Sequence, residues 1–102
     1  MQIQPGSQPF PRLQGSGPQV ISTSVTFPTA VTQATAILTG FIAEFSPRDD
    51  HHLGQVDIQV TVPSGGVNGT NVTVSVTFGL RDWSDNWDDN YDGQVFFTVI
   101  GE

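Results

Sequence analysis

Residues 72–78 read Val-Thr-Val-Ser-Val-Thr-Phe, and this stretch decides the fold of the chain. Apolar and polar side chains alternate with a period of two, which is the pattern of a β-strand with one buried face. Residues 56–62 (Val-Asp-Ile-Gln-Val-Thr-Val) repeat the pattern. The segment between them, residues 63–71, is rich in glycine and asparagine. Residues 55–79 are therefore predicted to form a β-hairpin.

Further strands are expected at residues 20–26, 33–45 and 94–100, where β-branched and aromatic residues dominate. Residues 94–100 are apolar on both faces, which predicts a strand in the middle of a sheet. No segment shows the 3.6-residue apolar period of an amphipathic helix. The sequence therefore predicts an all-β fold, an antiparallel β-sandwich of about five to eight strands.

Residues 1–19 differ in composition from the rest of the chain, because they hold four prolines and three glycines together with several glutamines. Such a composition is typical of an extended, polyproline-like segment. We expect an extended N-terminal arm at 1–19, followed by the β-sandwich domain at 20–102. The arm has little apolar surface of its own, so it must be held by its own domain or by a neighbouring subunit.

The charge balance excludes several classes of partner. The 102 residues include three arginines and no lysine against ten acidic residues, and the net charge is −7. This surface is a poor match for nucleic-acid phosphates or for an anionic membrane, so neither partner is expected. Cysteine is absent, which excludes disulfides and thiolate metal sites. The first residues lack a signal peptide, and no apolar run is long enough to insert in a membrane. We expect a soluble chain.

Charged residues make up 13% of the chain, against about 25% in ordinary soluble domains. A polar surface with few charges suits subunits that pack against neighbours. We therefore expect a homo-oligomer, or assembly with other subunits.

Residues 82–93 (Asp-Trp-Ser-Asp-Asn-Trp-Asp-Asp-Asn-Tyr-Asp-Gly) hold five of the ten acidic residues. Residues 88–93 match the first half of a calcium loop, in which alternate side-chain oxygens bind the ion and glycine permits a bend. An EF-hand would place a glutamate at the twelfth loop position. Here that position is Val99, so an EF-hand is excluded.

Two interpretations of the acidic segment remain. In the first, calcium is bound with the help of further oxygens, for which Asp89 and Glu44 are also available. In the second, the Asp and Asn side chains cap their own turns. The candidate metal ligands are Asp82, Asp85, Asp88, Asn90 and Asp92.

Residues 88–102 resemble the C-terminal calcium loop of small bacterial fucose- and mannose-binding lectins, which are calcium-dependent β-sandwiches. The resemblance implies that Asp88, Asn90 and Asp92 are calcium ligands and that the ion would bind sugar hydroxyls. The family has a carboxylate where this chain has Gly93, and it uses its C-terminus, here Glu102, as a ligand.

Trp83, Trp87 and Tyr91 recur at every fourth position of the same segment. Aromatic rings beside carboxylates suit sugar stacking or a protein contact, so these three residues are the candidate ligand-binding residues. The alternative is that the rings fold inward and close the open end of the sandwich.

Residues 49–52 (Asp-Asp-His-His) form another cluster with metal-ligand chemistry, as a transition-metal site or a second part of the calcium site, but a hydrogen-bonded loop corner is the preferred interpretation. No motif organises a catalytic set, so we expect no enzymatic activity. Two functions compete. The first is a structural or interaction subunit of a particle, tail or filament, with the N-terminal arm contacting a neighbour and the acidic loop stiffened by calcium. The second is a calcium-dependent carbohydrate-binding module.

Overall fold

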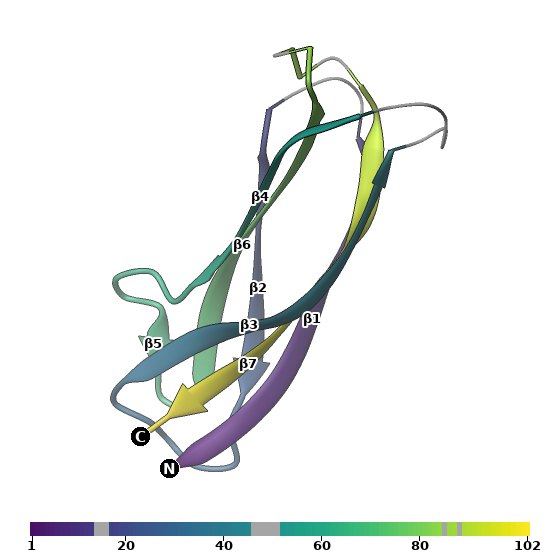
Figure 1. Cartoon of the computed structure of the whole chain (residues 1–102). Coiled ribbons are helices and arrows are strands. Elements are labelled where there is room, and N and C mark those ends of the chain that lie inside the picture. The colour runs from purple at the N-terminus through teal and green to yellow at the C-terminus, as the bar shows by residue number, and fades with distance from the viewer. Residues whose placement is uncertain (14–16, 46–51, 85, 88) are drawn as a thin grey trace.

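The computed structural model describes residues 1–13, 17–45, 52–84, 86–87 and 89–102. These residues form two antiparallel β-sheets that pack face to face, as Figure 1 shows. The predicted β-sandwich is thus confirmed. The described part of the chain contains no helix of the length and apolarity needed to cross a membrane.

The first sheet, called sheet A, has the strand order β1-β7-β3. Its strands are β1 (Gln2–Leu13), β7 (Tyr91–Gly101) and β3 (Ala34–Phe45). The last strand of the chain therefore lies in the middle of its sheet, as its apolar faces predict. The pairing of β3 with β7 shifts register between Leu38 and Gly40, so Thr39 is an extra, bulged residue.

The second sheet, called sheet B, has the order β2-β6-β4, and the short β5 (Val67–Asn68) also pairs with β6. Its strands are β2 (Gln19–Thr26), β6 (Asn71–Asp82) and β4 (Leu53–Thr61). The antiparallel pairing of β4 with β6 confirms the hairpin expected at 55–79.

The core lies between the two central strands, β6 and β7. The apolar residues of the alternating stretch 72–78 all point inward and are fully buried. Rings bridge the sheets, because Phe78 stacks on Phe10 at a centroid distance of 4.8 Å and contacts Tyr91 at 5.6 Å. The remaining buried apolar side chains are Val25, Phe27, Val31, Leu80, Val95, Phe97 and Val99.

The N-terminal segment differs from the expected separate arm. Gln2–Leu13 is a full strand of sheet A, paired antiparallel with β7 from Gln2 opposite Gly101 to Leu13 opposite Tyr91. Two features of its composition explain this. Prolines are tolerated because β1 is an edge strand, where a missing N–H interrupts no ladder. Gly6 leaves room for the ring of Phe97, which would lie 2.6 Å from a Cβ atom at that position. The strands of the described residues therefore belong to one sandwich from Gln2 onward.

The molecule is elongated, with extents of 47 × 20 × 18 Å. Figure 1 shows both termini at one end and the connection from β6 to β7 at the other. The strands of sheet A are 11 and 12 residues long, about twice the ordinary strand length of about 5–6 residues. Long strands give this small sandwich long edges.

Candidate functional site

The acidic segment 82–93 is divided between two strands and the turn that joins them. Asp82 is the last residue of β6, and Asp92 and Gly93 belong to β7. Residues 83–84, 86–87 and 89–90 lie between the strands, and Asn90 is the described candidate ligand among them. Asp85 and Asp88 lie outside the described residues. The calcium-loop spacing therefore does not correspond to one continuous loop, because its second half is a β-strand.

Asp82 caps the turn that follows β6. Its Oδ1 atom accepts a hydrogen bond from the Ser84 main-chain N–H at 2.9 Å and another from the Ser84 hydroxyl. The Arg81 guanidinium donates to the Asp82 main-chain oxygen at 2.9 Å. This is the turn-capping arrangement that the sequence offers as the alternative to calcium ligation.

Asp92 lies directly opposite Glu44 in the pairing of β3 with β7. The two residues therefore share one face of sheet A, as the sequence allowed by offering Glu44 as a further source of oxygen. Within the described residues, no group of three or more His, Cys, Asp or Glu side chains is arranged to hold a metal. Calcium binding remains a prediction.

Gly93 has a packing role. A Cβ atom at this position would lie 1.9 Å from the main-chain oxygen of Ile42 and 2.8 Å from Cζ of Phe78. The residue allows β3 and the core ring to approach β7 closely. The interpretation of Gly93 as the bending residue of a calcium loop is therefore wrong, because it lies within a strand.

The three candidate aromatic residues have three different environments. Trp83 is 73% exposed, Trp87 is half-buried against the core, and Tyr91 is fully buried. The Trp87 ring lies 5.8 Å from the Arg81 guanidinium carbon, which is a cation–π distance. Trp83 is the only one of the three whose ring is largely open to solvent.

Tyr91 is a core residue, which corrects its prediction as a ligand-binding residue. Its hydroxyl donates to the main-chain oxygen of Gly17 at 3.1 Å and so ties the start of β7 to the chain before β2. Burial raises the pKa of the Tyr91 phenol above the ordinary value of 10.0, and a side-chain hydrogen bond with Gln19 lowers it in part. A ligand at the surface cannot reach this ring.

Of the cluster at residues 49–52, only His52 is among the described residues. Its main-chain oxygen accepts a hydrogen bond from the main-chain N–H of Trp83 at 3.0 Å. The centroids of the His52 and Trp83 rings lie 5.0 Å apart, and the rings are tilted by 49°. His52 is exposed. The end of the sandwich thus carries an exposed Trp–His pair.

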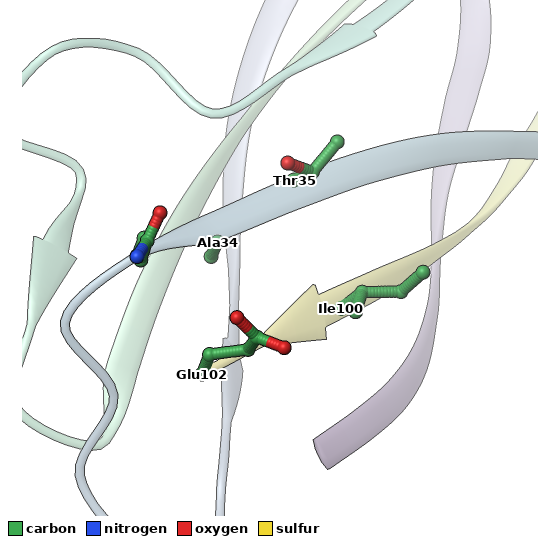
Figure 2. Close-up of a pocket in the computed structure, with 5 residues that line it drawn as sticks. Ala34, Thr35, Ile100 and Glu102 are labelled. Atoms are coloured by element: carbon green, nitrogen blue, oxygen red, sulfur yellow. The ribbon is translucent and has the colours of Figure 1, made fainter. Parts of the chain in front are cut away.

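A small pocket of about 100 Å³ lies at the opposite end, where β3 begins and β7 ends (Figure 2). It is lined by Gln33, Ala34, Thr35, Ile100 and Glu102. Ligand pockets usually hold about 300–1,000 Å³, so this pocket suits a few water molecules. The main-chain oxygen of Glu102 accepts hydrogen bonds from the N–H groups of Thr32 and Gln33 at 2.6 and 3.2 Å. The pocket and the acidic segment lie at opposite ends of β7, an 11-residue strand about 35 Å long.

Sequence reasoning missed the edge of β3 that faces away from β7, where the middle residues carry large exposed apolar side chains. Ile37 is 45% exposed, Leu38 39%, Phe41 45% and Ile42 55%. Glu44 is the only charged residue in this strand. The signal in the sequence was a 12-residue strand without proline or lysine, the residues that usually protect an edge.

No protein-family model matches this chain, and comparison with curated proteins and with solved structures finds no significant match.

Proposed function

We propose that the chain is a non-enzymatic subunit of an oligomeric assembly, and that the free edge of β3 is its main contact. The observation that carries this proposal is the row of four half-exposed apolar side chains at residues 37–38 and 41–42. In the described part of the chain β3 is the edge of its sheet, and an edge strand of this length and apolarity is a template for pairing with another chain.

The other edge of sheet A supports this choice by contrast. β1 carries Pro5, Pro9 and Pro11, which are spaced four and then two residues apart. Proline offers no N–H to a pairing strand, so this edge is blocked. The sequence-based expectation placed the neighbour contact on the N-terminal segment. Because that segment is itself a strand of sheet A, β3 is the edge of this sheet that is open to a neighbour.

Sheet B offers a weaker edge on each side. The exposed side chains of β2 are Val20 and three Ser or Thr residues, and those of β4 are Leu53, two glutamines and Thr61, so each edge carries one exposed large apolar side chain against four on β3. Burying apolar surface provides about 25 cal/mol per Å², so β3 gains most from a contact.

The test is the oligomeric state, measured by light scattering and sedimentation over a dilution series. The wild-type chain is expected to self-associate, and Phe41→Lys is expected to weaken the association. Val20→Lys is the matched control, because Val20 is 62% exposed on an edge strand of sheet B. A wild-type chain that remains monomeric at every concentration would contradict the proposal.

A carbohydrate-binding module is the second candidate, and the exposed Trp83 ring beside His52 favours it. An exposed indole next to polar groups is a stacking surface for a sugar ring. Asp82, which caps the adjacent turn, supplies a nearby carboxylate.

This second function is tested on a glycan array with calcium and with a chelator present. Trp83→Ala is expected to remove glycan binding and to leave the melting temperature unchanged, because Trp83 is 73% exposed and its ring lies beside the exposed His52. If binding requires calcium, the chelator removes it as well. Glycan binding that survives Trp83→Ala, or a wild-type chain that binds no glycan, would exclude this site.

A further inference from the structure

The middle of β3 reads nearly the same in both directions. Outward from the pair Thr39–Gly40, the two directions meet Leu38 and Phe41, then Ile37 and Ile42, then Ala36 and Ala43. The exposed apolar side chains of the strand are the first two pairs of this series. A palindromic edge is what a two-fold contact requires, because residue i then meets residue j and residue j meets residue i.

The first pair, Leu38 and Phe41, is compatible with such a contact only because of the bulge at Thr39. In a regular strand, residues three apart point to opposite faces. Leu38 lies opposite the buried Phe97, and Phe41 lies opposite the buried Val95. Residues directly opposite in an antiparallel pair share a face. The extra residue Thr39 therefore places Leu38 and Phe41 on the same inner face.

The second pair, Ile37 and Ile42, also shares one face of the sheet. Ile37 lies opposite Thr98, and Ile42 lies opposite Gln94. Thr98 lies between the buried Phe97 and Val99, and Gln94 directly precedes the buried Val95, so both residues mark the outer face of sheet A. Ile37 and Ile42 are five residues apart and yet share that face, again because of Thr39. Side-chain face and side-chain type are thus both symmetric about the centre of β3.

We propose that β3 pairs antiparallel with β3 of a second copy of this chain, about a two-fold axis between Thr39 and Gly40. This inference rests on the proposed function, in which the β3 edge is an assembly contact. The two copies of sheet A then form one continuous six-stranded sheet. Ile37 faces Ile42 of the second copy on the outer face, and Leu38 faces Phe41 of the second copy on the inner face.

The charge pattern of β3 is compatible with this register. Glu44, its only charged residue, lies opposite Thr35 of the second copy. A register shifted toward the carboxyl ends would bring Glu44 near its own counterpart, and like charges directly opposite are destabilising. The central register also buries the largest number of exposed apolar side chains.

Disulfide trapping tests the register. The chain has no cysteine of its own, so an introduced cysteine can form a disulfide only with another introduced cysteine. Chains carrying Ile37→Cys are mixed with chains carrying Ile42→Cys, and the mixture is oxidised. Cross-strand pairs have Cα atoms about 4.5–5.5 Å apart, which suits a disulfide. Covalent dimers are expected in the mixture. Neither variant alone is expected to form them, because its own copies lie about 15 Å apart across the pair.

A charge on the edge gives a second, independent measurement. Ile37→Glu is expected to raise the dissociation constant of the dimer by at least about tenfold, which is about 1.4 kcal/mol. Ile3→Glu is the control, because Ile3 is 59% exposed on the blocked β1 edge of the same sheet. Both variants keep the fold, as circular dichroism would verify.

The outcomes separate this inference from the proposed function. A trimer, an open polymer, or cross-linking of Ile37→Cys with itself overturns the two-fold register and leaves assembly through β3 standing. A dimer that Ile37→Glu does not weaken overturns the register as well. A wild-type chain that remains monomeric overturns both proposals together.

Discussion

Gly93 has the main-chain oxygen of Ile42 on one side and the ring of Phe78 on the other. The missing side chain of Gly93 lets β3 and the Phe78 ring approach β7 closely. Its backbone does not adopt the left-handed conformation that favours glycine. A side chain here must displace either the backbone of β3 or the aromatic cluster. At the scale of a single residue, the packing of sheet A on the core is therefore most sensitive at this position.

Gly93→Ala is expected to lower the free energy of unfolding by about 1–3 kcal/mol or more, because overpacking forces the neighbouring backbone to move. Urea denaturation measures this value. Gly40→Ala is the matched control at a dilution where the chain is monomeric, since a Cβ atom at Gly40 would have no neighbour within 4 Å of its own chain. The control is expected to change stability by less than about 0.5 kcal/mol. Equal stability of the two variants would contradict the packing role of Gly93.

Tyr91→Phe is expected to lower the free energy of unfolding by about 1 kcal/mol, because the hydrogen bond to the Gly17 main-chain oxygen is lost. The substitution also changes the pH dependence. The pKa of the phenol is raised in the folded state, so the native chain holds this proton more tightly than the unfolded chain.

The contribution of that proton is fully present below pH 10 and is lost as the pH rises through the folded-state pKa. Urea denaturation between neutral pH and pH 11 measures this loss. The wild-type chain is expected to lose stability above pH 10, and Tyr91→Phe is expected to lose less. A parallel decline of both chains would contradict the assignment to Tyr91.

At the scale of the element, β1 is held along one side by β7 and through the Phe10 ring in the core. Phe10 is 2% exposed and stacks on Phe78. The composition of this segment resembles that of a flexible arm, but its backbone completes sheet A. Removing its anchoring ring therefore affects the whole sandwich.

Phe10→Ala is expected to cost about 3–5 kcal/mol of unfolding free energy, the usual cost of emptying a buried phenylalanine site. Thermal and urea unfolding provide the measurement. Ile3→Ala, in the same strand but 59% exposed, is expected to change stability by less than about 0.5 kcal/mol. If β1 were a detachable arm, Phe10→Ala would leave the stability of the remaining domain unchanged.

At the scale of the whole molecule, a net charge of −7 opposes any contact between two copies. This repulsion acts mainly between charges that lie away from the contact, because Glu44 is the one charged residue of β3. Raising the ionic strength from about 0.01 M to about 0.1 M shortens the Debye length from about 30 Å to about 10 Å. Sodium chloride should therefore favour self-association.

The dissociation constant of the wild-type dimer is expected to fall severalfold over this range, as measured by sedimentation. A contact held by ion pairs would show the opposite trend and weaken with salt. Such weakening would contradict an apolar contact at the β3 edge.

Much of the fold could be predicted from the sequence, because local alternation reports which face of a strand is buried. The stretch 72–78 predicted β6, and the doubly apolar 94–100 predicted the central place of β7. The acidic segment was less predictable. Its spacing allowed a calcium loop, but the start of β7 at Tyr91 places Asp92 and Gly93 in a strand. Asp82 instead caps a turn through Ser84.

The all-β class, the positions of the main strands and the buried face of residues 72–78 follow from the sequence alone, since each depends on a pattern of side chains within a few residues. The tertiary structure alone decided three further features. These are the pairing of β1 with β7, the burial of Tyr91, and the exposure of the apolar β3 edge. Each depends on contacts between residues far apart in the chain. No local pattern of side chains specifies which strand becomes an edge.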